Sequence, residues 1–265
     1  MFQQVEDFGA ESEALYRVLE PLDDVDLAQP TLFKAWTFDD VLQHLHIWNK
    51  AAQKAVQDPD AFTAMLAELM QDLQQDSMRA WESRMLDGMT GRPLLQAWRD
   101  GCNELCTVFA ELDPKTRLRW AGPDMSARSS ITARQMETWA HGQAVFDQLG
   151  VERRDQDRIR NIAVLGVNTY GWAFKNRGLD IPQPAPVVRL TSPSGDRWEW
   201  NTHDGPDLVE GSAVEFCQVV TQTRNIADTS LRVAGDNATA WMKIAQCFAG
   251  PPEEPPAPGA RHIQK

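Results

Sequence analysis

Cysteine, histidine and tyrosine are scarce in this chain of 265 residues, with four, five and two copies respectively. Four cysteines at this length do not form a disulfide framework, so we interpret all four as reduced residues of the core. The chain also lacks any apolar run near the roughly 20 residues that a membrane-spanning helix needs. Its N-terminus, MFQQVEDFGAE, has neither the basic nor the apolar region of a signal peptide. We therefore expect a soluble, cytoplasmic protein.

The chain also has no excess of positive charge. It contains 26 Lys and Arg residues and 38 Asp and Glu residues, which gives a net charge of −12. Proteins that bind nucleic acid use basic surface patches, and anionic membranes attract clusters of Lys and Arg. We therefore expect neither nucleic acid nor a membrane as a partner, and a small-molecule substrate instead. Composition leaves open whether the chain forms a homodimer.

Apolar residues recur at helical spacing through most of the first two thirds of the sequence. Thr37 and Asp40 form a T-x-x-D capping signal at the start of an apolar stripe that continues to Trp48. The stretch ITARQMETWAHGQAVFDQLG, residues 131–150, has similar spacing and ends at a glycine. We expect helices at residues 3–20, from Thr37, after Asp58-Pro59, between Pro93 and Pro114, at 131–150 and at 154–176.

The pattern changes at residues 181–186, IPQPAP, which we interpret as a linker between two domains. Beyond it, apolar residues recur with period two around a glycine-containing turn, which predicts a β-hairpin over Val187–Trp200. Helical patterns return at 211–224 and 237–249, and the ending is rich in proline and polar residues. The sequence therefore predicts a helical domain at 1–182, a small α/β domain at 183–250 and a disordered tail at 251–265.

Glu137 and His141 lie four residues apart within the stretch 131–150, so both project from one face of the expected helix. An isolated E-x-x-x-H is more often an ordinary surface pair than a metal site. His44 and His46, however, flank the apolar stripe that begins after Thr37, and in an antiparallel bundle one of them can reach the same interior. Periodicity does not choose between these two histidines.

A carboxylate and two imidazoles would give a metal three protein ligands. Three ligands leave positions open for water or substrate, which is the arrangement of catalytic rather than structural zinc sites. Mixed nitrogen and oxygen donors suit Zn²⁺, with Ni²⁺ or Fe²⁺ as alternatives. The spacing therefore predicts a divalent-metal site without naming the metal.

Two motifs resemble the mycothiol-dependent maleylpyruvate isomerase branch of the DinB-like superfamily: Trp36-Thr37-x-x-Asp40-Val41-x-x-His44-Leu45 and Arg134-x-x-Glu137-x-Trp139-x-His141-Gly142. The resemblance implies an N-terminal DinB-like four-helix bundle followed by a small C-terminal α/β domain of sterol-carrier-like fold. It also implies a divalent metal, usually zinc, held by His44, Glu137 and His141. By this resemblance His44, and not His46, is the third ligand.

A weaker match continues into the second half of the chain, at Cys217-x-x-Val220-Thr221-Gln222-x-Arg224. This segment takes the place of one that contributes an arginine to the active site of the family, so the resemblance implies Arg224 as a catalytic residue. Asp147, six residues after His141, is a candidate to hold a metal ligand in place by a hydrogen bond. We expect a pocket between the two domains, with Arg224 brought towards the metal.

The family's chemistry uses a small thiol such as mycothiol, which adds to a conjugated double bond, lets that bond rotate and then leaves. Other members transfer a thiol to an electrophile. The resemblance therefore implies a metal- and thiol-dependent isomerase or S-transferase that acts on a small electrophilic or unsaturated acid. Two alternatives stay open: a hydrolase that uses metal-bound water, and a non-enzymatic binder of small ligands whose metal is structural.

Overall fold

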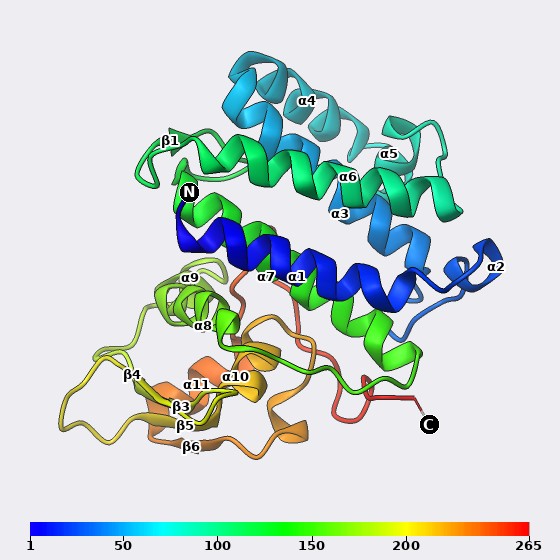
Figure 1. Ribbon diagram of the computed structural model, residues 1–265. Coiled ribbons are helices and arrows are strands. Elements are labelled where there is room, and N and C mark those ends of the chain that lie inside the picture. The colour runs from blue at the N-terminus through cyan, green and yellow to red at the C-terminus, as the bar shows by residue number, and fades with distance from the viewer. Residues whose placement is uncertain (265) are drawn as a thin grey trace. The chain divides into compact units, whose positions relative to one another are not determined.

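A computed structural model describes residues 1–264 of the chain, which form two compact units (Figure 1). The first unit is Met1–Val145, and the second begins at Phe146. The chain is mostly helical with one small mixed sheet, as the sequence predicts. The finer assignments, a DinB-like four-helix bundle and a sterol-carrier-like second domain, stay predictions. Within the described residues, no helix combines the length and the apolar character needed to cross a membrane.

Helices make up almost all of the first unit. Its elements are α1 (Gln3–Leu19), α2 (Asp24–Leu27), α3 (Phe38–Gln57), α4 (Pro59–Asp72), α5 (Met78–Met85), α6 (Gly91–Ala110), β1 (Arg117–Leu118), β2 (Met125–Ser126) and α7 (Ala127–Gln148). The antiparallel strands β1 and β2 lead into α7, which begins four residues earlier than the sequence predicts. The last residues of α7 belong to the second unit.

The predicted capping signal sets the start of α3. The Thr37 hydroxyl accepts a hydrogen bond from the Asp40 backbone N–H at 3.1 Å, and the Asp40 carboxylate accepts one from the Thr37 N–H at 2.8 Å. These reciprocal bonds satisfy donors that would otherwise lack partners at the helix end. Because they fix where the helix begins, they also fix the direction in which His44 projects in the second turn.

The long helices of the first unit pack closely on one another. α3 packs against α6, and α6 packs against α1. α7 approaches α1 at Gly142, where an added Cβ would lie 3.4 Å from the Leu15 side chain. The buried Arg134 of α7 donates from Nε to the Asn49 side chain of α3 at 2.9 Å. These contacts hold α3 and α7, which carry the predicted metal ligands, against the same core.

A cluster of buried side chains joins α3, α4 and α5. Its members are Ile47, Trp48, Ala51, Ala55, Phe62, Met65, Leu69 and Trp81. The Met and Leu side chains of α4 are therefore core residues. Trp81 is fully buried and anchors α5, and truncating such a side chain to Ala costs about 3–5 kcal/mol. The buried Trp81 also fixes the position of the next residue, Glu82.

The second unit combines short helices with a four-stranded sheet. Its elements are a 3₁₀ turn (Asp157–Ile159), α8 (Arg160–Asn168), α9 (Tyr170–Lys175), β3 (Val187–Thr191), β4 (Arg197–Trp200), β5 (Leu208–Ser212), α10 (Ala213–Val220), a second 3₁₀ turn (Ile226–Asp228), β6 (Arg232–Ala234) and α11 (Asp236–Ile244). The strand order is β4-β3-β5-β6, with β3 and β5 parallel and the other pairs antiparallel. The β3–β4 pair confirms the predicted hairpin.

The helix predicted over residues 154–176 is wrong in detail, because the chain breaks at Thr169 between α8 and α9. The Thr169 hydroxyl and its backbone N–H both donate to the Leu165 carbonyl, at 2.8 and 3.0 Å, an arrangement that often bends helices. α8 packs on α10 and α9 on α11, so both belong with the sheet. The compact units divide within α7, between Val145 and Phe146, while the predicted domain boundary at 182 and 183 stays a prediction.

The proline-rich tail belongs to the second unit, and its disorder stays a prediction. Residues 251–264 contain no helix or strand, but their backbone makes specific hydrogen bonds within the second unit. The Gln264 N–H donates to the Asp147 carbonyl at 2.8 Å, and the Gly259 N–H donates to the Asp228 carboxylate at 2.8 Å. Proline lacks a backbone donor, so the tail depends on such single bonds rather than on a regular pattern.

Candidate metal centre

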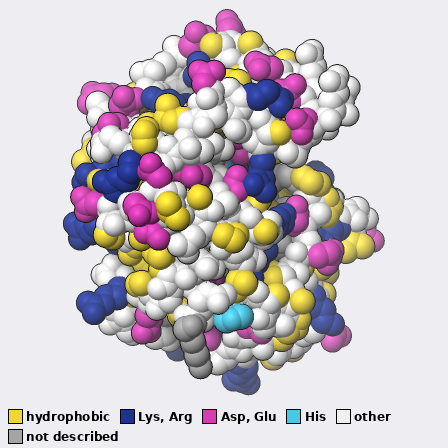
Figure 2. All heavy atoms as spheres, turned by 90° about the vertical axis from the view of Figure 1, so that its right-hand side faces the viewer, with side chains coloured by type: hydrophobic (Ala, Val, Ile, Leu, Met, Phe, Trp, Pro, Cys, Tyr) yellow, Lys and Arg dark blue, Asp and Glu magenta, His cyan; other side chains and the backbone are white. Residues whose placement is uncertain are grey.

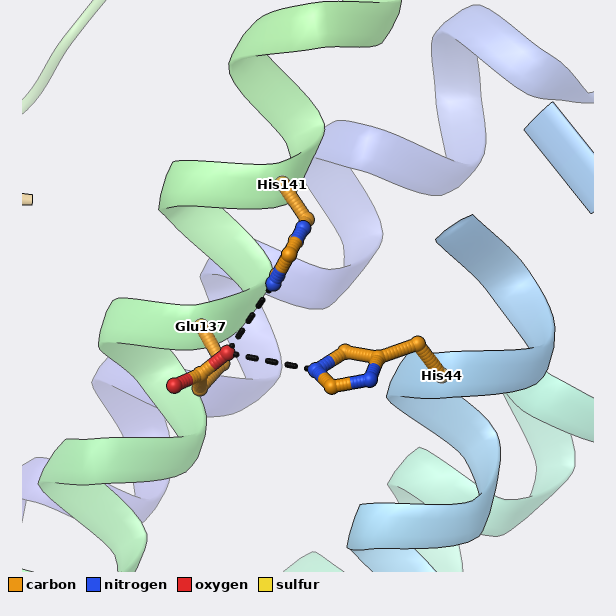
Figure 3. Close-up of side chains that lie close together, drawn as sticks. All are labelled: His44, Glu137 and His141. Atoms are coloured by element: carbon orange, nitrogen blue, oxygen red, sulfur yellow. Dashed lines mark hydrogen bonds and ion pairs between the residues drawn. The ribbon is translucent and has the colours of Figure 1, made fainter. Parts of the chain in front are cut away.

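The structure brings the three predicted ligands together. His44 of α3 and Glu137 and His141 of α7 point toward one another, and their ligand atoms all lie within 4.8 Å (Figure 3). His46, which spacing alone could not exclude, lies elsewhere: its buried ring faces Gly101 of α6, where an added Cβ would be 3.2 Å away. Geometry therefore favours His44 as the third member of the cluster.

One carboxylate oxygen is the meeting point of the cluster. Glu137 Oε2 lies 3.4 Å from His44 Nε2 and 3.1 Å from His141 Nε2. Two ligands of one tetrahedral zinc ion, bonded at about 2.0–2.2 Å, are about 3.4 Å apart, so these separations suit a shared cation. The donor set of two imidazoles and a carboxylate fits a divalent metal chemically as well.

Glu82 holds His44 in the orientation that the site requires. Glu82 Oε1 lies 2.8 Å from His44 Nδ1 and accepts a second hydrogen bond from Trp48 Nε1 at 3.0 Å. A carboxylate on one imidazole nitrogen, with the other nitrogen free for a metal, is common at metal-binding histidines. When Nδ1 donates to Glu82, the lone pair of Nε2 faces Glu137.

Aromatic rings hold His141 in place. The Trp36 ring stacks on the His141 imidazole, with centroids 5.4 Å apart and planes 5° apart, and Phe33 meets it edge-on at 5.1 Å. Among the described residues, His141 Nδ1 has no hydrogen-bond partner, so packing replaces the carboxylate that orients His44. Trp139 is fully buried and lies two residues from each α7 ligand, on the opposite side of the helix.

Opposing effects set the pKa values of the three side chains. Burial lowers the pKa of His44, but the Glu82 and Glu137 carboxylates outweigh it and raise the value to about 9. Burial also raises the pKa of Glu137, yet bonds from the two histidines keep it well below its usual value. For His141, burial lowers the pKa more than the bond to Glu137 raises it. Glu137 is therefore favoured as a carboxylate beside the two imidazoles. Of the two, His44 is the one that is more readily protonated.

A sequence model for the mycothiol maleylpyruvate isomerase N-terminal domain matches residues 8–146, which include the whole cluster. The chain belongs to this family. Two curated relatives, both named uncharacterized proteins of Mycobacterium tuberculosis (strains H37Rv and CDC 1551), are 38% identical over 250 residues. The match covers 94% of this chain and 96% of each relative.

Solved structures with a similar fold include two of mycothiol-dependent maleylpyruvate isomerase, one of them a mutant. Each aligns with a TM-score of 0.51 over 82% of this chain and 87% of the other. The identities are 14% and 13%, so this likeness concerns the fold alone.

Arg224, the arginine that family resemblance singles out, is already paired within the second unit. Its guanidinium makes two bonds to the Asp147 carboxylate, at 2.6 and 2.7 Å, and both side chains are largely buried. Asp147, suggested as a partner of the metal ligands, thus bonds to Arg224. The roles of Arg224 in catalysis and of a pocket between the domains stay predictions.

Glu82 is the site residue that sequence reasoning missed. It lies on the short helix α5, directly after the buried Trp81, and the local sequence contains no motif that would mark it as a site residue. We expect Glu82→Gln to weaken zinc binding by about 10–100-fold, because the amide keeps the shape but loses the charge that orients His44. Titration with a competing chelator measures this, and an unchanged affinity would show that Glu82 is not needed.

Burial makes the cysteines of this chain poor nucleophiles. Burial raises the pKa of Cys102 to about 12 and of Cys106 to about 11, and it raises that of Cys217 strongly. Thiols react as thiolates, so we expect these three to react with a disulfide reagent at neutral pH far more slowly than a free thiol, until urea unfolds the chain. Fast labelling of the folded protein at any of them would contradict this.

Proposed function

We propose that the chain is a divalent-metal-dependent enzyme of the thiol-dependent isomerase or S-transferase type, acting on a small electrophilic or unsaturated acid. The observation that carries the proposal is the cluster of His44, Glu137 and His141, which lies inside the segment that matches the isomerase family. Zinc is the metal we propose first, with nickel or iron as alternatives.

The donor set suits this role. His44, Glu137 and His141 would hold the ion, and their single negative charge would leave a dication with net positive charge. Such an ion, when bound, supplies Lewis acidity that lowers the pKa of a thiol and polarises a carbonyl. Glu82 keeps His44 Nε2 directed at Glu137, while Trp36 and Phe33 limit the motion of His141. The fixed side chains thus reduce the reorganisation that ligand binding requires.

We propose that the thiol comes from solution, because burial raises the pKa of Cys102, Cys106 and Cys217 and so disfavours their thiolates. Mycothiol is the candidate that the family's description provides. In an isomerisation, the thiolate adds to a conjugated C=C bond and forms a C–S bond. Rotation follows about the resulting single bond, and the thiolate then leaves as the double bond re-forms, so no thiol is consumed. In a transfer, the C–S bond persists and a leaving group departs.

Arg224 is proposed to hold the carboxylate of the acid substrate. Its guanidinium binds the Asp147 carboxylate through two bonds, and the same two-bond contact would suit a substrate carboxylate. For a substrate to bind in this way, it must replace or share the bonds to Asp147.

The test compares the zinc-loaded chain with chain stripped by a chelator, each with and without mycothiol. Maleylpyruvate probes isomerisation, and a fluorogenic alkyl halide probes S-transfer. We expect turnover of at least one probe only when both metal and thiol are present. Hydrolysis of an ester probe by the zinc-loaded chain without thiol would support the hydrolase instead. Bound metal without turnover of any probe would support a structural role.

A further inference from the structure

Arg134 is a charged side chain in the core of the first unit. It is 2% exposed and lies on α7, three residues before the proposed ligand Glu137. Its Nε donates to the Asn49 side chain, and within residues 1–264 its Nη2 has no hydrogen-bond partner. A guanidinium keeps its charge in proteins, and a buried charge destabilises the fold unless other charges compensate it. The fold therefore needs negative charge near Arg134.

Two carboxylates of the metal centre supply this compensation. Burial lowers the pKa of Arg134, and the Glu137 and Glu82 carboxylates act against burial. Glu137 projects from the same face of α7, about one turn further along the helix. Asn49, which binds Arg134, directly follows Trp48 on α3, and Trp48 Nε1 donates to Glu82 at 3.0 Å. The guanidinium thus lies within electrostatic reach of both carboxylates.

The hydrogen-bond partner of Arg134 is a neutral amide and not a carboxylate. Asn49 Oδ1 accepts from Arg134 Nε at 2.9 Å, and Asn49 Nδ2 donates to Cys102 Sγ at 3.4 Å, so both ends of the buried amide are held. A carboxylate in this place would pair with the guanidinium and cancel its charge. The amide fixes the guanidinium and leaves its positive charge to act on the metal centre, where the low dielectric constant of the interior strengthens the effect.

Two negative charges surround the proposed metal position. The three ligands bring one, from Glu137, and the buried Glu82 adds a second behind one of the histidines. Together these carboxylates would neutralise a bound dication completely. Arg79, which also lies near the cluster, forms an ion pair with Asp40 and so contributes no net charge. Arg134 restores one positive charge, so the loaded site would still attract an anion.

We propose that Arg134 is a positioning residue that sets the net charge of the metal centre, and thereby its preference for anionic over neutral ligands. The inference rests on the proposed function and adds to it the group that keeps the loaded site positive. Arg134 acts through its charge and not as a ligand. Because like charges repel, it also weakens the binding of the metal itself.

Cobalt(II) in place of zinc tests this on the full chain, because the visible absorption of cobalt changes when another ligand binds. We expect the native cobalt-loaded chain to bind azide, a small anion. Arg134→Met should bind azide at least about tenfold more weakly and cobalt about tenfold more tightly. Asn49→Asp, which places a carboxylate where the amide now lies, should change both affinities in the same directions. Binding of pyridine, a neutral ligand, should stay at its native strength.

Cys102→Ala is the matched control. It alters the packing of the same buried cluster, because Cys102 Sγ accepts from Asn49, but it removes no charge. This variant can lose stability, and its affinities for cobalt and azide should equal those of the native chain. Equal changes in all three variants would show that Arg134 acts through packing and would overturn the inference. Native affinities in both Arg134→Met and Asn49→Asp would overturn it as well.

The same measurements separate this inference from the proposed function. If the native chain binds neither zinc nor cobalt, the proposed function is wrong, and the inference about Arg134 with it. If the native chain binds the metal and azide affinity does not depend on the charge of Arg134, only the inference is wrong. Asn49→Asp has nearly the shape of the native side chain, so it decides the question even if Arg134→Met does not fold.

Discussion

His141→Ala is expected to weaken zinc binding by more than about 100-fold, because losing a direct ligand costs more than the 10–100-fold typical of residues that only orient one. The variant keeps Glu137 and His44 but leaves two protein ligands in place of three. Zinc at 100 times its dissociation constant stabilises a native chain by about 2.7 kcal/mol, so the zinc-dependent rise in melting temperature should disappear as well. Competitive chelator titration and thermal unfolding with and without zinc measure the two effects.

His46→Ala provides the matched control, since it makes the same change on α3, two residues from His44. The His46 ring faces Gly101 and not the cluster. This variant can lose stability because the ring is buried, but its folded form should still bind one zinc per chain. Native affinity in His141→Ala, or loss of zinc in His46→Ala, would contradict the ligand assignment.

Arg224→Ala is expected to lower the free energy of unfolding by about 3 kcal/mol, because removing one partner of a buried ion pair leaves the other charge poorly compensated. Both side chains are largely buried and share two short bonds. Urea unfolding measures the loss. Zinc should still bind to the folded fraction, and turnover per folded chain should fall because the contact to the substrate carboxylate is removed.

Two comparisons isolate the ion pair. Arg224→Met combined with Asp147→Leu should lose less stability than either single change, since apolar pairs often replace buried ion pairs without cost. Arg232→Ala removes an arginine whose side chain is 70% exposed and pairs with Glu210 at 3.3 Å, so it should cost less than about 1 kcal/mol. An Arg224→Ala chain as stable as the native one would show that the pair contributes nothing.

Local patterns in the sequence predicted the parts of the molecule that depend on neighbouring residues. The capping box at Thr37, the hairpin over Val187–Trp200 and the shared face of Glu137 and His141 all follow from spacings of two to four residues. The choice of His44 over His46 came from family resemblance, because both flank one stripe, and only the packing of α3 on α6 turns His46 away from the cluster.

Features that join distant parts of the chain were not predictable in this way. Glu82 contacts His44 across 38 residues, and Arg224 contacts Asp147 across 77, so no local period relates the partners. The helical pattern also gave no sign of the interruption at Thr169, which separates α8 from α9. The face shown in Figure 2 has Lys and Arg interspersed with Asp and Glu, a pattern that net charge alone cannot reveal.

The stacking of Trp36 on His141 places a fluorescent side chain directly beside one of the proposed metal ligands. An indole stacked on an imidazole changes its emission when that imidazole gains a charged or paramagnetic neighbour. Zinc, with a filled d shell, should therefore shift the emission, whereas nickel should quench it. A Trp36→Phe chain should lose most of this response while its remaining tryptophans continue to emit. Intrinsic tryptophan fluorescence should therefore distinguish bound zinc from bound nickel without a label or a substrate.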